Sequence, residues 1–155
     1  MFDLDDPAFT RTNITDPGFG FIDGIAITPD QSRVLLVDAS SPSLHVVRVD
    51  SVAPSIERSI ALPGGHAYFG AIAIMDVDDT CFIATGNPEP VGAPVGTSLV
   101  QVNYETGAVT ENPTNLPADT WELAIAMYGS PAVPHVVSCA SSGFVAISPA
   151  AAPGV

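Results

Sequence analysis

Residues 24–30 of this chain read Gly-Ile-Ala-Ile-Thr-Pro-Asp, and closely similar stretches follow twice. Residues 71–76 read Ala-Ile-Ala-Ile-Met-Asp, and residues 122–127 read Glu-Leu-Ala-Ile-Ala-Met. The steps between the three stretches are 47 and 51 residues, counted at the first branched apolar residue of each. A repeat of about 50 residues without helical periodicity is typical of β-propeller blades. We therefore expect an all-β fold built from such blades.

Each repeat divides into short apolar segments separated by turn residues, which predicts strands. In the first repeat these segments are 24–28, 33–38, 44–49 and 56–62. The later segments are 72–75, 81–85, 99–103 and 109–116 in the second repeat, and 123–127, 136–139 and 144–148 in the third. The predicted four-stranded blades of a single domain are thus approximately 24–62, 71–116 and 122–148, the last with one strand missing.

The missing strand is predicted at the other end of the chain. Residues 11–27 align without a gap with residues 58–74, which contain the last strand of one blade and the start of the next. Residues 9–14 therefore resemble a fourth strand that precedes the first complete blade. One blade is then divided between the two ends of the chain.

Three blades are too few to close a ring, since propellers have typically four to eight. In a homodimer, each N-terminal strand would complete the third blade of the partner and give a six-bladed ring without exposed strand edges. Alternatively, the chain is a fragment of a longer propeller of six to eight blades. A start at Met1 and the strand count favour the homodimer.

The chain is strongly acidic, with 17 Asp and Glu residues, four arginines, no lysine and a net charge of −13. We therefore expect neither nucleic acids nor anionic membranes as partners, because proteins bind them mainly through Lys and Arg. The absence of lysine also excludes Schiff-base and P-loop chemistry. Two explanations of the acidity stay open: solubility through like-charge repulsion, and adaptation to high salt, which screens that repulsion.

Nothing in the sequence resembles a targeting or membrane segment. The acidic start, Met-Phe-Asp-Leu-Asp-Asp, lacks the basic and apolar regions of a signal peptide. No apolar run approaches the roughly 20 residues of a membrane span. We expect a soluble chain without membrane insertion, and the compartment stays open.

Two stretches resemble the repeats of YVTN/NHL-type β-propellers. Residues 24–38 are similar to their opening strand, Pro-Asp-Gly turn and Val-rich second strand, and residues 102–109 are similar to their Asp-x-x-Thr-Gly-x-Val turn between the third and fourth strands. The chain departs from that pattern at Gln31, where Gly is usual, and in the Pro-rich stretch 87–96. The resemblance implies a propeller and says little about function, because these motifs are structural.

The wider group contains lactonases that hold one divalent cation at the channel mouth. That resemblance implies Asp23, Glu122, Asn87 and Asp38 as candidate ligands, since oxygen donors suit a hard cation such as Ca²⁺. The equivalent position before the second repeat is Gly-Ala, so the ligand set is incomplete. The alternative is that these four are ordinary polar loop residues. Apart from such a cation, no cofactor is expected.

Histidines and cysteines offer little for catalysis. His66, in a loop before the second repeat, is the one candidate general acid or base, with a solvated loop histidine as the alternative. His45 is placed within a strand and His135 at the start of another, and none of the three histidines has zinc-site spacing. We expect Cys81 and Cys139 to be buried free thiols on separate blades.

The Pro-rich stretch 87–96 is a candidate partner-binding loop on the rim. Its prolines exclude it from a strand ladder and hold it extended. The contact residues would be Pro88, Pro90, Val91, Pro94 and Val95. A stiff loop without a partner is the alternative.

Two function classes follow. The first is a non-catalytic propeller for binding or assembly, including a structural part of a larger particle, and the absence of a complete catalytic constellation favours it. The second is a metal-dependent lactonase-like hydrolase, in which Asp23, Glu122 and Asn87 would hold the ion that polarises a lactone carbonyl.

Overall fold

A computed structural model describes residues 18–50, 53–75, 78–86, 98–113, 122–130, 133–140 and 143–147. Within these ranges every regular element is a β-strand, and the strands form three antiparallel sheets. The class is therefore all-β, as the sequence predicts. No helix that could cross a membrane occurs in the described ranges.

Two of the sheets are four-stranded meanders and the third has three strands. Sheet 1 contains β1 (Ile22–Ile27), β2 (Arg33–Asp38), β3 (Ser43–Arg48) and β4 (Ser55–Ala61), in that order. Sheet 2 contains β5 (Ala67–Met75), β6 (Thr80–Gly86), β7 (Ser98–Asn103) and β8 (Val109–Pro113). Sheet 3 contains β9 (Glu122–Ser130), β10 (Val133–Ala140) and β11 (Gly143–Ile147).

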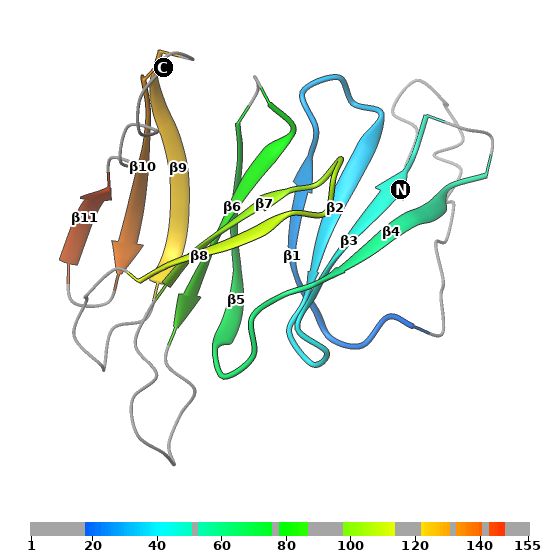
Figure 1. Cartoon of the computed structure of the whole chain (residues 1–155), viewed down its shortest axis with the longest axis horizontal. Coiled ribbons are helices and arrows are strands. Elements are labelled where there is room, and N and C mark those ends of the chain that lie inside the picture. The colour runs from blue at the N-terminus through cyan, green and yellow to red at the C-terminus, as the bar shows by residue number, and fades with distance from the viewer. Residues whose placement is uncertain are drawn as a thin grey trace, which may run out of the picture.

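The sheets follow one another in chain order. Figure 1 shows sheet 1 in blue and cyan, sheet 2 in green and yellow, and sheet 3 in orange and red, side by side across the molecule. The first strand of sheet 2, β5, contacts the first strands of both neighbours, β1 and β9. Sheet 2 is thus the middle layer, and it has a neighbour on each face.

The core that the described side chains form lies between sheets 1 and 2. Residues directly opposite in an antiparallel pair share a face, so the pairs Val37–Leu44 and Leu35–Val46 turn to the same side of sheet 1. From sheet 1 and the residue after it the core takes Leu35, Val37, Leu44, Val46, Ile60 and Leu62; from sheet 2 and its turn it takes Tyr68, Cys81, Ile83, Val100, Val102 and Tyr104. Branched and aromatic residues at alternate positions thus explain both the strands and their packing.

The segments predicted as strands between residues 24 and 148 each overlap a strand of the structure. The largest difference is at β5, which begins at Ala67 rather than near residue 72. Ala67 and Tyr68 pair with Gly86 and Thr85, and the register then shifts before Ile72. Such an irregularity interrupts the alternation on which the prediction depends. The predicted N-terminal strand 9–14 lies outside the described residues.

The turn between β1 and β2 places Gln31 in a conformation that favours Gly. Gln31 has a φ of 60°, in the left-handed region that disfavours residues with a Cβ. Asp79, in the corresponding turn of sheet 2, has a φ of 55°. The turn is held by two bonds to Thr28, whose carbonyl accepts from the Gln31 amide at 2.8 Å and whose amide donates to the Arg33 carbonyl at 3.0 Å.

A Gln31→Gly variant is expected to be more stable than the wild type by about 0.5 kcal/mol. The left-handed conformation costs a residue with a Cβ about 1–2 kcal/mol, and the greater freedom of unfolded Gly offsets about 0.5–1 kcal/mol of the gain. Urea unfolding measures the difference. Ser32→Gly in the same turn is the control: Ser32 does not have positive φ and its amide and hydroxyl bond to Asp30, so stability should fall. A stabilised Ser32→Gly together with a destabilised Gln31→Gly would contradict this account.

Candidate functional site

Asp38, the last residue of β2, is fully buried and organises the end of sheet 1. Its Oδ2 accepts from the Gly20 amide at 2.7 Å, and its Oδ1 accepts from the Phe21 amide at 3.2 Å. The amides of Ser40 and Ser41 also donate to Oδ1, at 2.9 and 3.1 Å, and the Ser40 hydroxyl donates at 2.8 Å. The carboxylate thus joins the segment before β1 to the turn after β2.

These hydrogen bonds decide the ionisation of Asp38. Burial by itself raises the pKa of the carboxyl, but the bonds from Gly20, Ser40 and Ser41 outweigh that effect and lower the pKa to about 2. The group is therefore a carboxylate at neutral pH, and its lone pairs face protein donors.

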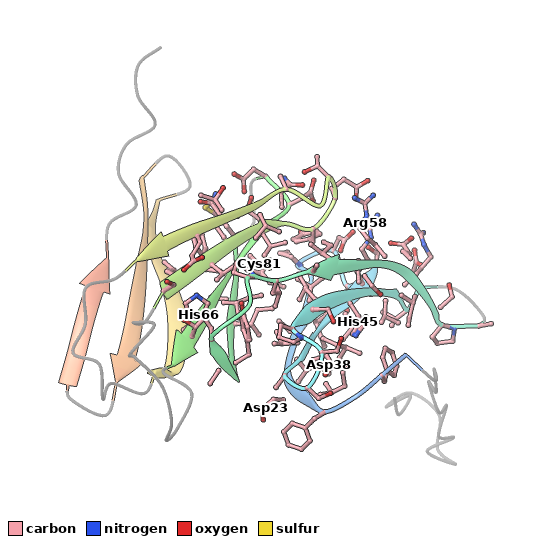
Figure 2. All side chains as sticks on the ribbon, turned by 60° about the horizontal axis from the view of Figure 1, so that its bottom comes forward. Asp23, Asp38, His45, Arg58, His66 and Cys81 are labelled. Carbon is pink, nitrogen blue, oxygen red and sulfur yellow. The ribbon has the colours of Figure 1, made fainter. Side chains whose placement is uncertain are left out.

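The four candidate metal ligands differ in their surroundings. Asp23 is exposed on β1 near Asp38, as Figure 2 shows, whereas Asp38 is occupied by backbone amides. Glu122 begins β9, and Asn87 lies outside the described residues. Among the residues that the structure describes, no group of three or more His, Cys, Asp or Glu could hold a metal ion. Describing Asp38 as an ordinary polar loop residue is wrong, because it is a buried structural carboxylate.

His66 is buried rather than solvated, so the solvated-loop alternative is wrong for this residue. Its Nε2 lies 2.8 Å from Oε1 of Glu111, and the Ser98 hydroxyl donates to the same oxygen at 2.8 Å. Hydrogen bonds from Ser98 and from His66 lower the pKa of Glu111. The His66 ring also packs edge-on against Tyr68, with 6.4 Å between ring centroids. These contacts join the segment before β5 to β7 and β8, and they describe a structural histidine.

His45 in sheet 1, like His66, is a buried histidine with a hydrogen-bond partner. Its Nδ1 lies 2.8 Å from Oγ of Ser59, its directly opposite residue on β4, and its Nε2 lies 3.7 Å from Oδ2 of Asp38. The Phe19 ring covers it edge-on at 5.1 Å. Ser59, His45 and Asp38 therefore share one face, but the Asp38 contact is longer than a hydrogen bond.

Cys81, on β6, is a buried free thiol, as predicted, and desolvation raises its pKa to about 12. It is therefore a poor nucleophile. Cys139 lies on β10, and nothing is described of its side chain. The candidate partner loop with Pro88, Pro90, Val91, Pro94 and Val95 falls outside the described residues.

The exposed apolar surface of sheet 1 is the feature that best marks an interaction site. Ile25 and Ile27 on β1 are 67% and 60% exposed, and Phe21 just before β1 is 64% exposed. Ile25 and Ile27 are opposite Leu36 and Val34, so they are on the face that points away from sheet 2. We call Ile25, Ile27 and Leu36 the open face of sheet 1.

The same repeat positions are packed in sheet 2. Ile72 and Ile74 on β5 correspond to Ile25 and Ile27 in the repeat, and both pack against the core between sheets 1 and 2. The isoleucines are thus covered where a preceding sheet is present and exposed where the described residues provide none.

Comparison with known proteins informs the fold alone. No protein-family model and no curated protein matches the chain. The chain is similar to the crystal structure of a functionally unknown protein from Desulfotomaculum acetoxidans DSM 771, with a TM-score of 0.53 and 16% sequence identity. The match covers 86% of this chain and 41% of that protein, which is therefore about twice as long.

Sequence reasoning missed a group of arginines that the fold brings together. Arg33, Arg48 and Arg58 stand on three consecutive strands of sheet 1 and line one cavity. The sequence carried no signal for this group, because it depends on the register that places Arg33 opposite Arg48.

An Asp38→Asn variant is expected to lose about 3 kcal/mol of folding stability at pH 7, because an amide cannot replace a carboxylate that accepts several bonds. The folded pKa is about 2 and the unfolded value is 3.8, so this carboxylate stabilises the fold above pH 4. Its contribution is lost as the pH falls through 2. The gap between wild type and variant should therefore shrink by about 2 kcal/mol from pH 5 to pH 2.

Urea unfolding at pH 7, 5, 4, 3 and 2 tests this expectation. Asp23→Asn is the matched control, since Asp23 is exposed on the adjacent strand. It should change stability little at any of these pH values. A gap for Asp38→Asn that stays constant with pH would contradict the assigned ionisation.

Proposed function

We propose that this protein is a non-catalytic binding and assembly module, and that its open face associates with a second copy of the chain. The repeats would then be blades of a β-propeller, and two copies would provide the six blades of a closed ring. The observation that carries the proposal is the contrast between exposed Ile25 and Ile27 and packed Ile72 and Ile74.

The chemistry of the open face supports a sheet as its partner. In sheet 2, the equivalent face packs against the Leu and Val side chains of β2 and β3. A surface that complements Ile25 and Ile27 is thus an apolar sheet face of the same repeat type. Burying an isoleucine side chain stabilises an interface by about 1.5–3 kcal/mol, so the two residues contribute several kcal/mol.

The number of sheets supports a second copy of the chain as the source of the apolar sheet face that would cover Ile25 and Ile27. Sheet 2 has neighbours on both sides, whereas among the described sheets sheet 1 has contacts with sheet 2 alone. The similar protein of about twice the length is compatible with a complete fold that needs about twice this number of repeats. Two copies of this chain supply that number through a two-fold interface.

Mass measurement by light scattering tests the proposal. The wild type is expected at about twice 15.9 kDa, and Ile25→Ser combined with Ile27→Ser is expected to weaken dimerisation at least a hundredfold. The matched control, Ile25→Val with Ile27→Val, keeps the face apolar and should remain dimeric. Since the mutated side chains are exposed in the single chain, the serine variant should still fold, which circular dichroism can check.

A folded wild-type monomer across concentration and salt would overturn association with a second copy. A dimer that is insensitive to the serine substitutions would show that the copies associate through another surface. Either result would leave the all-β fold in place and remove the open face as the site of assembly.

A further inference from the structure

We infer that the cavity between sheets 1 and 2 beside Arg58 is a binding site for a small monocarboxylate. It has a volume of about 240 Å³. Its lining residues are Arg33, Val46, Arg48, Glu57 and Arg58 from sheet 1, and Tyr104 and Glu105 from the turn after β7. Three of the four arginines of a chain with net charge −13 therefore surround one small space.

Two of these arginines are neutralised by neighbouring carboxylates. Nε of Arg33 lies 2.7 Å from Oε2 of Glu57, and its Nη2 lies 3.1 Å from Oε2 of Glu105. Arg48 pairs with the other oxygen of Glu57 and approaches Asp50 at 3.6 Å. The hydrogen bond to Glu57 raises the pKa of Arg33, and the same bond lowers the pKa of Glu57. This network fixes one wall of the cavity.

Arg58 differs, because its side chain is exposed and has no hydrogen bond or ion pair within the described part of the chain. It is opposite Val46 and therefore projects on the face toward sheet 2. Figure 2 shows it beside the turn between β7 and β8. A guanidinium has five donors, and those of Arg58 are available to a ligand in the cavity.

The guanidinium of Arg58 lies beside Gly107. Gly107 has a φ of +82°, and a Cβ added there would lie 3.1 Å from Nη1 of Arg58. The turn is held by Asn103, whose carbonyl accepts from the Gly107 amide at 2.8 Å and whose Oδ1 accepts from the Thr106 amide at 2.6 Å. The guanidinium is thus placed against a glycine surface without being neutralised.

Charge and size select the class of ligand. Three arginines and two glutamates leave the lining one positive charge, which a monoanion matches and a dianion exceeds. A carboxylate pairs with the two parallel donors of a guanidinium. The volume is below the roughly 300–1,000 Å³ of most ligand sites, so only a small acid fits. The buried Tyr104 ring offers an apolar wall for its carbon atoms.

Titration of the ¹⁵N-labelled protein with sodium acetate tests the inference. Chloride is replaced by acetate at constant ionic strength, and the amide of Gly107 and the Nε–H of Arg58 are followed by NMR. A saturable shift of both signals is expected, with weaker shifts for phosphate at pH 8, where it is a dianion. Phosphate binding tighter than acetate binding would overturn the assignment to a carboxylate.

Variants distinguish the effect of the Arg58 side chain on acetate binding from the effect of the net charge of the cavity. Arg58→Gln should weaken acetate binding at least tenfold. Arg48→Gln removes the same charge from the same cavity, but that charge is already balanced by Glu57, so the change should be less than threefold. Glu105→Gln should strengthen binding, because it removes a negative charge from the lining. Absence of a saturable shift in the wild type, or equal affinity in Arg58→Gln, would overturn the site, and neither result depends on whether the protein dimerises.

Discussion

Burial of sheet faces against one another is the constraint on which the rest of this structure depends. Each of the first two sheets has apolar residues on both faces. In β2, for example, Val and Leu occupy consecutive positions, which point to opposite faces of the sheet. A strand of this kind exposes apolar side chains unless both of its faces are covered. Sheet 2 satisfies the requirement within the chain, since β5 contacts both β1 and β9. Sheet 1 leaves Ile25 and Ile27 exposed, so the fold itself generates the surface that we assign to assembly.

Polar networks fix the edges of these layers. Asp38 joins the segment before β1 to the turn after β2, and Glu111 joins His66 to Ser98 in sheet 2. In both of these sheets, one carboxylate accepts hydrogen bonds from segments that are distant in the sequence. Since buried polar groups are mostly paired, these contacts are part of what holds each sheet together.

The strand pattern was readable from the sequence because short apolar stretches rich in β-branched residues recur at the repeat distance, with turn residues between them. The register was not readable, and register decides which side chains meet. Thus the sequence predicted β2 well, whereas it could not indicate that His45 would face Ser59 or that Arg33 would face Arg48. His66 shows a second limit: its place in a predicted loop suggested a solvated side chain, but its partner Glu111 lies 45 positions away along the chain. Long-range hydrogen bonds leave no mark in local composition.

Acidity and assembly are coupled through salt. Two copies that each have a net charge of −13 repel one another, and this repulsion extends over about 10 Å at 0.1 M salt but only about 3 Å at 1 M. The apolar contacts of Ile25 and Ile27 do not weaken under the same change. Salt therefore favours association through the open face, whereas it competes with an anion for Arg58. The two proposed sites respond to salt in opposite directions, because one is apolar on a repelling molecule and the other is a single attracting charge.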